Sequence, residues 1–227
     1  MQLDGALLDP MEQLEFTSAQ QLIFKKQSVD KALLIRFPTR WWNKAMWFNM
    51  NAAIRFERIE ALLGNIDPLC PTVMMPIHLL RSQQDYLQWR FSIEELDRIV
   101  GTLIENMKAY VLPFFETLES IEKLKLQLLR EIERNKWAAE QRAHLATEAE
   151  RTSFNLMLRQ NEGLRLVLDP LQRLEKLAAI YVAEGDKNLA QALINNALAE
   201  IEYTVPQVRQ AGRRRSLEKL RMTLGLN

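Results

Sequence analysis

The spacing of hydrophobic and polar residues changes near Ser92 of this chain. Before Ser92, hydrophobic residues recur mainly at every second position, which is typical of strands. After it they recur every three to four positions, which is typical of helices. The change predicts an α+β protein, with an antiparallel sheet of four or five strands covered by helices and followed by an all-helical C-terminal region. We assign residues 1–130 to the sheet domain and residues 131–227 to the helical region.

The clearest strand pattern covers residues 45–56. Hydrophobic residues occupy the even positions, and they alternate with polar residues that include Asn49, Asn51 and Arg55. An alternation of this length predicts one strand with one face on a core and the other face accessible. We therefore expect these three polar side chains on an accessible face of the sheet.

Several shorter segments complete the predicted sheet domain. The further strands are expected at residues 22–24, 31–37, 76–81 and 86–91. Residues 38–43 are predicted to connect two strands, and residues 82–85 to form a polar hairpin loop. A short helix is expected over residues 4–15, and a helical turn from Glu57 that ends at Gly64.

The helical pattern begins with residues that have the spacing of a capping box. Ser92 can accept a bond from an early helix amide, and Glu95 can reach back to the amide of the cap. The helix that follows is predicted to cover the apolar side of the sheet and to end at Pro113, which fits the first turn of the next helix. Residues 133–153 are largely alanine and charged residues, which predicts an exposed, projecting helix.

Residues 170–203 are predicted to form a helical hairpin. Tyr181, Gly185, Ala190 and Ala197 follow the spacing of a tetratricopeptide repeat, and the segment resembles one such repeat. A single repeat cannot build a solenoid, because each unit needs neighbours to bury its faces. The hairpin is therefore either a closely packed helix pair or a peptide-binding groove.

A basic helix is predicted at residues 208–224. Its basic residues are Arg209, Arg213, Arg214, Arg215, Lys219 and Arg221, and Glu218 is the one acidic residue in the segment. Such a patch is typical of a site for an anion or an acidic partner. It is more often typical of a solvated terminal helix whose cations interact with the helix dipole.

Composition removes several classes of function. The 30 Lys and Arg residues against 29 Asp and Glu residues leave a net charge of +1, so the chain as a whole has no strong attraction for nucleic acid or an anionic membrane. One cysteine, Cys70, and two histidines exclude disulfide frameworks and cysteine zinc sites. We expect no metal, no cofactor, no membrane span and, in the absence of an export signal, a cytoplasmic location.

Candidate partner-binding residues lie on the predicted accessible face and at one end of the sheet. They are Arg40, Trp41, Trp42, Asn49, Asn51, Arg55, His78, Arg81 and Arg90. Tryptophan and arginine dominate the energy of many protein interfaces, although Trp41 and Trp42 could instead pack under a helix. No catalytic residue is assigned, because no nucleophile, base and oxyanion site occur together.

The order of these segments resembles a bacterial family, domain of unknown function 4304. The resemblance rests on Phe16, residues 24–26, 31–37, 48–51 and 77–81, Trp89 and residues 112–114, and it covers about residues 10–130. It implies a small α+β domain without established catalytic residues, and residues 133–153 depart from it. Small cytoplasmic proteins of this kind are often the immunity halves of bacterial toxin–immunity pairs, which is an association and not a physical deduction.

We therefore expect a non-enzymatic binding protein, most specifically a cytoplasmic immunity protein that binds and blocks a bacterial toxin. One alternative is a nucleic-acid-binding protein that uses the basic C-terminal helix and stacks bases on Trp41 and Trp42. The other alternative is an enzyme that uses His78 and Arg81 on a small phosphorylated substrate.

Overall fold

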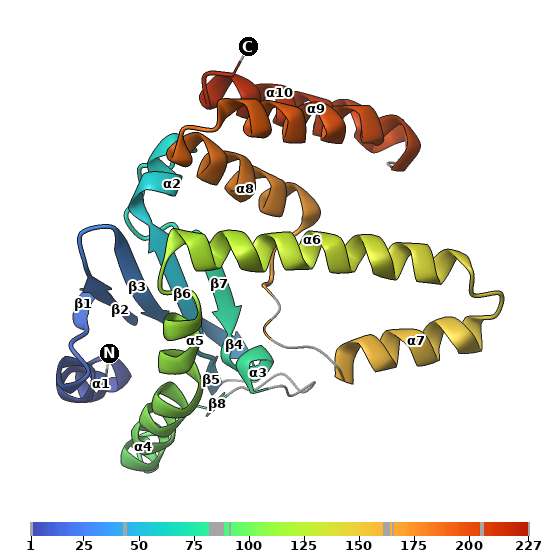
Figure 1. Cartoon of the computed structure of the whole chain (residues 1–227). Coiled ribbons are helices and arrows are strands. Elements are labelled where there is room, and N and C mark those ends of the chain that lie inside the picture. The colour runs from blue at the N-terminus through green and yellow to red at the C-terminus, as the bar shows by residue number, and fades with distance from the viewer. Residues whose placement is uncertain are drawn as a thin grey trace.

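The computed structural model describes residues 2–42, 45–81, 89–90, 92–160, 164, 166–204 and 207–226. Within them, five antiparallel strands form a large sheet in the order β1-β2-β3-β6-β7, and three form a small sheet in the order β4-β5-β8. Helices pack beside the sheets and form the whole C-terminal part of the chain (Figure 1). The predicted α+β class and helical C-terminal region are confirmed, and the small sheet is an addition to them.

The elements have the following bounds. The strands are β1 (Thr17–Gln20), β2 (Ile23–Gln27), β3 (Lys31–Arg36), β4 (Thr39–Trp42), β5 (Ala45–Phe48), β6 (Asn51–Phe56), β7 (Val73–Pro76) and β8 (Trp89–Arg90). The helices are α1 (Gln2–Gln13), α2 (Glu57–Leu62), α3 (Ile77–Leu80), α4 (Leu96–Asn106), the π-helical η1 (Met107–Val111), α5 (Leu112–Thr117), α6 (Ile121–Ala143), α7 (Glu148–Gln160), α8 (Pro170–Glu184), α9 (Lys187–Thr204) and α10 (Gln207–Thr223).

The single long strand predicted over residues 45–56 is wrong, because the chain changes sheets in its middle. β5 ends at Phe48, and Asn49 and Met50 lead into β6 of the large sheet. The Asn49 amide donates to the Pro38 carbonyl (3.2 Å) and the Ile77 amide to the Met50 carbonyl (2.9 Å). The hydrophobic alternation continues through the break, since Phe48, Met50 and the apolar side of β6 belong to one core. The predicted connection at residues 38–43 contains β4.

The strand predicted over residues 76–81 is also wrong in its larger part. Pro76 ends β7, and α3 begins at Ile77, which is fully buried. A short apolar run fits a strand or a helical turn equally well by its periodicity, so the pattern alone could not separate the two. Of the strand predicted at residues 86–91, β8 is described; residues 82–88 and Phe91 lie outside the described residues.

The predicted capping box at Ser92 is wrong. α4 begins at Leu96 with Glu95 as its cap residue, without a side-chain bond, and the Ser92 hydroxyl donates instead to the Glu94 carboxylate (2.5 Å). α4 ends at Asn106, and the wide turn of η1 stands between it and Pro113, so Pro113 is not the residue that ends α4. The prediction that Pro113 fits the first turn of the next helix is confirmed, since it lies in the first turn of α5. The hydrophobic side of α4 joins the main core as expected.

The C-terminal helices follow the prediction closely. α8 and α9 form the helical hairpin, with a capping box between Asp169 and Gln172 at its start and Gly185 at φ +90° at its turn. α10 packs along α9 (Figure 1). Within the described residues, no helical segment has the length and hydrophobicity that crossing a bilayer requires.

Residues 133–153 belong to two helices. They comprise the second half of α6, a turn and the start of α7, which folds back beside α6 to form an arm that extends from the rest of the molecule (Figure 1). The rings of Trp137 and Phe154 lie 5.7 Å apart between centroids and join the two helices.

Two buried ion pairs hold α8 in place, one to α2 of the sheet region and one to α6 within the helical region. Lys176 lies 2.6 Å from the Glu60 carboxylate of α2, and Arg173 lies 2.8 Å from the Glu131 carboxylate of α6. Around these pairs, side chains of both regions form one hydrophobic cluster. The domain boundary predicted after residue 130 falls within α6.

Candidate functional site

The large sheet has two faces, one packed on the main core and the other covered in part by a loop. One face carries residues of the main core, such as Phe24 and Ile54. The second face carries Leu34 and Ala53, and Leu69 of the loop formed by residues 63–72 packs on them. Because successive residues of a strand point to opposite sides, Asn51 and Arg55 of β6 belong to this second face together with Ala53.

The expectation that Asn49, Asn51 and Arg55 lie on an accessible face is wrong. Their exposed fractions are 7%, 8% and 4%. The loop of residues 63–72 folds over the second face and covers Arg55, while Asn49 lies at the turn between the two sheets. These side chains therefore cannot offer the contact surface that the strand pattern predicted.

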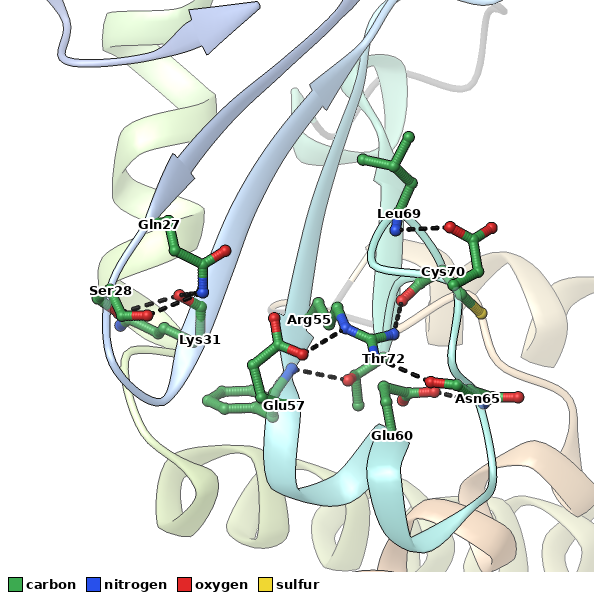
Figure 2. Close-up of polar contacts among 12 residues, drawn as sticks. Gln27, Ser28, Lys31, Arg55, Glu57, Glu60, Asn65, Leu69, Cys70 and Thr72 are labelled. Carbon is green, nitrogen blue, oxygen red and sulfur yellow. Dashed lines mark hydrogen bonds and ion pairs between the residues drawn. The ribbon is translucent and has the colours of Figure 1, made fainter. Parts of the chain in front are cut away.

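Arg55 holds the covering loop in place (Figure 2). Its Nε donates to the Glu57 carboxylate (2.7 Å), its Nη1 to the Cys70 carbonyl (2.8 Å) and its Nη2 to the Asn65 carbonyl (2.9 Å). Three charge-assisted bonds from one planar group fix the path of the chain on both sides of the loop. The guanidinium is structural in this arrangement.

His78 and Arg81 lie on and just after α3, so their predicted place on a sheet strand is wrong. His78 is half-buried, and this burial lowers the pKa of its imidazole below the usual value. The guanidinium carbon of Arg81 lies 5.6 Å from the ring centroid of Tyr110, which is a cation–π contact. Arg81 is thus engaged with η1.

The small sheet brings two of the predicted arginines together. Arg40 of β4 is opposite Trp47 of β5, and Trp47 is opposite Arg90 of β8. Residues directly opposite each other in antiparallel strands point to the same side, so the three side chains form a row, which we call the Arg–Trp–Arg row. Arg40 and Arg90 are exposed and, in the described part of the chain, make no hydrogen bond or ion pair.

Trp41 and Trp42 continue β4 beside this row. Their backbones pair with Met46 and Ala45 of β5. Their side chains lie outside the described residues, so the choice between a packed and an exposed position stays a prediction. Trp47 is not among the predicted partner-binding residues. The sequence signal that could have indicated it is the same as for Trp41 and Trp42, because it is an aromatic residue in a strand beside a cluster of tryptophan and arginine.

The predicted basic helix is α10. Leu217 and Leu220 are buried on one of its sides, and Leu224 is buried directly after its end. Arg213, Arg215 and Lys219 are exposed on the remainder, and Arg214 and Arg221 are half-buried. Among the described residues, Arg213, Lys219 and Arg221 make no ion pair. The side chain of Arg209 is outside the described residues.

The described residues therefore hold two candidate surfaces, the Arg–Trp–Arg row and the outer side of α10. They contain no group of three or more His, Cys, Asp or Glu side chains that could hold a metal ion. Comparison of the chain with protein-family models, with curated proteins and with solved structures finds no match.

Proposed function

We propose that this chain is a non-enzymatic binding protein that recognises another protein through the Arg–Trp–Arg row. The observation that carries the proposal is the register of the small sheet, which places two exposed guanidinium groups, unpaired within the part of the chain that the structure describes, on either side of a partly buried indole. Tryptophan and arginine in one cluster are typical of interface hot spots, where a large apolar ring supplies contact area and the cation supplies oriented hydrogen bonds.

In its most specific form the proposal makes the chain a cytoplasmic immunity protein, and its partner a bacterial toxin. The reason for naming a toxin is the resemblance of about residues 10–130 to the domain of unknown function 4304 family. Arg40 and Arg90 require acidic side chains on the partner, since opposite charges across an interface accelerate association and exclude wrong partners. The complex is expected to form faster at low salt than at high salt.

Co-expression with the product of the adjacent open reading frame tests this proposal. The neighbour is expected to be toxic alone, and tolerated and co-purified when this chain is present. The variant that combines Arg40→Ala with Arg90→Ala should weaken binding about 30-fold, which corresponds to the loss of one hot spot. If the neighbour is harmless and does not co-purify, the proposal that the partner is a toxin is contradicted.

A matched control distinguishes the loss of the Arg–Trp–Arg row from a general loss of positive charge. Arg58 of α2 and Lys108 of η1 are exposed and unpaired in the described part of the chain, so Arg58→Ala with Lys108→Ala removes the same charge elsewhere. This control should bind as the wild type does. Equal affinities of the two double variants would show that the row is not the contact surface.

Nucleic-acid binding through α10 is the second candidate function. It is favoured by three cations on one helix, Arg213, Lys219 and Arg221, which make no ion pair with any residue that the structure describes. Fluorescence anisotropy with a labelled single strand should show affinity that falls with salt, and Arg213→Ala with Lys219→Ala should reduce the slope of log K against log salt by about 0.7 for each lost phosphate contact. Binding that is unchanged in this variant would exclude α10 as the contact surface.

A further inference from the structure

A cavity of about 410 Å³ lies on the second face of the large sheet, at the end opposite Arg55. It forms where β3 leaves the large sheet and the chain turns through Pro38 into β4 of the small sheet. The loop of residues 63–72 covers the other end of this face. The volume is within the range of about 300–1,000 Å³ that small-molecule sites occupy.

The register of the strands determines which side chains line the cavity. Ile23 of β2 is opposite Arg36 of β3, and Arg36 is opposite Asn51 of β6. These three side chains therefore point to the same side of the sheet. Arg36 thus lies between an apolar side chain and a buried amide, with Met74 of β7 also on the wall.

The cavity carries a positive charge, and none of the residues described in the structure supplies a counter-ion to it. Arg36 is half-buried, and within the described part of the chain its guanidinium makes no hydrogen bond or ion pair. None of the described lining residues has a carboxylate. Partial burial removes part of the hydration of the guanidinium, so an anion that forms two parallel hydrogen bonds with it is favoured over water. A carboxylate has the matching planar geometry.

Asn51 supplies a second recognition element. It is 8% exposed, and its Nδ2 lies 3.7 Å from the Met74 sulfur. Its Oδ1 accepts no hydrogen bond from the described residues. An acceptor that is buried without a donor from the described residues is unfavourable, so rotation of the Asn51 amide toward the cavity would let a ligand hydroxyl or amine supply that donor.

We propose that this cavity binds a small organic carboxylate that carries a hydroxyl or amino group and an apolar side chain. The carboxylate pairs with Arg36, the hydroxyl or amine donates to Asn51 Oδ1, and the apolar part contacts Ile23 and Met74. The site is separate from the Arg–Trp–Arg row and from α10, so it would add a ligand to a protein whose partner binds elsewhere.

Titration of the isotope-labelled full chain with 3-phenyllactate, followed by NMR, tests the site. The backbone amides of the lining residues are expected to shift with saturation at millimolar ligand or below. 2-Phenylethanol keeps the ring and the hydroxyl and lacks the carboxylate, so it should bind at least tenfold more weakly. Equal binding of the two compounds, or no saturable shift with 3-phenyllactate, would overturn the proposal.

Two variants assign the binding to Arg36. Arg36→Gln should weaken binding of 3-phenyllactate at least tenfold, whereas Lys25→Gln removes one charge from the neighbouring strand outside the cavity and should leave it unchanged. Asn51→Asp should also abolish binding, because the new carboxylate would pair with Arg36. Similar affinities of the Arg36 and Lys25 variants would contradict the site. The double variant of Arg40 and Arg90 should bind 3-phenyllactate normally, which keeps this test independent of the proposed function.

Discussion

At the scale of single residues, Arg55 shows how a charged side chain in an alternating strand can be part of the interior. The guanidinium is 4% exposed and donates to two carbonyls of the loop that covers it, Asn65 and Cys70. Both carbonyls would lose a partner if the side chain were removed. Because Glu57 is one-third exposed, its carboxylate can still be hydrated. The carbonyls therefore dominate the contribution of Arg55 to stability.

Arg55→Leu is expected to lower the free energy of unfolding by about 2–4 kcal/mol, since it leaves two part-buried carbonyls without their donor. Urea denaturation measures the change. Arg58→Leu provides the control on the adjacent helix, because Arg58 is exposed and unpaired in the described part of the chain; its effect should stay within about 0.5 kcal/mol. Similar losses in the two variants would contradict the structural role of Arg55.

His78 makes stability depend on pH. Burial lowers the pKa of the folded imidazole below the unfolded value of about 6.5. Below that value the unfolded chain binds a proton before the folded chain does, so stability falls as the pH decreases through about 6.5 and levels off below the folded pKa. His78→Gln should remove this part of the decrease between about pH 7 and pH 5, whereas His144→Gln, on an exposed residue, is the control. Thermal unfolding across this range measures both, and parallel curves for His78→Gln and the wild type would contradict the prediction.

At the scale of elements, local signals place the ends of α8 more accurately than the start of α4. α8 has a reciprocal capping box at Asp169 and a glycine with positive φ after its last residue. Both features act within one helical turn, so neighbouring sequence suffices to specify them. The start of α4 lacks a side-chain cap, and its position depends on how Ile99 and Leu103 enter the core.

Substitutions at two glycines measure the effect of backbone conformation on stability without a change in side-chain packing. At both Gly185 and Gly101 an added Cβ has nothing within 4 Å. Gly185 has φ +90°, so Gly185→Ala should destabilise the protein by about 1 kcal/mol. Gly101 lies within α4, so Gly101→Ala should stabilise it by about 0.5–1 kcal/mol. Calorimetric melting temperatures should shift in opposite directions, and a shift in the same direction would contradict this assignment.

At the scale of the whole molecule, the sheet region and the C-terminal helices share a core. Leu124 of α6 and Leu177 of α8 belong to the same cluster as Phe24 and Ile54 of the large sheet. The Glu60–Lys176 pair lies at the junction, with Glu60 fully buried. Removing one partner of such a pair leaves an uncompensated charge in the interior. Disruption of the junction should therefore affect both regions together.

Lys176→Met is expected to lower the free energy of unfolding by about 3–5 kcal/mol. In a Trp137→Phe background the remaining tryptophans all lie in the small sheet, so their fluorescence reports on the sheets, while circular dichroism reports mainly on the helices. Both signals should move to the same lower urea midpoint. Lys187→Met, on an exposed residue, is the control. Separate midpoints for the two signals would show that the regions unfold independently.

The sequence by itself determined which side chains face the core and where the C-terminal hairpin turns. The alternation over residues 45–56 selected the buried apolar side correctly, although two strands in two sheets share it. Hydrophobic burial acts on every second residue of a strand whichever strand it pairs with, so this information is local. Gly185 likewise ended α8 through its own backbone conformation.

Only the tertiary structure decided which polar residues are accessible and which of them meet. Arg55 is polar in the pattern and buried in the fold because a loop from outside its strand covers it. Arg40, Trp47 and Arg90 share a row, and Arg36 and Asn51 share a cavity, through strand pairings that no local spacing specifies. Periodicity reports the side of a strand on which a residue lies, whereas its neighbours across the sheet depend on contacts between distant parts of the chain.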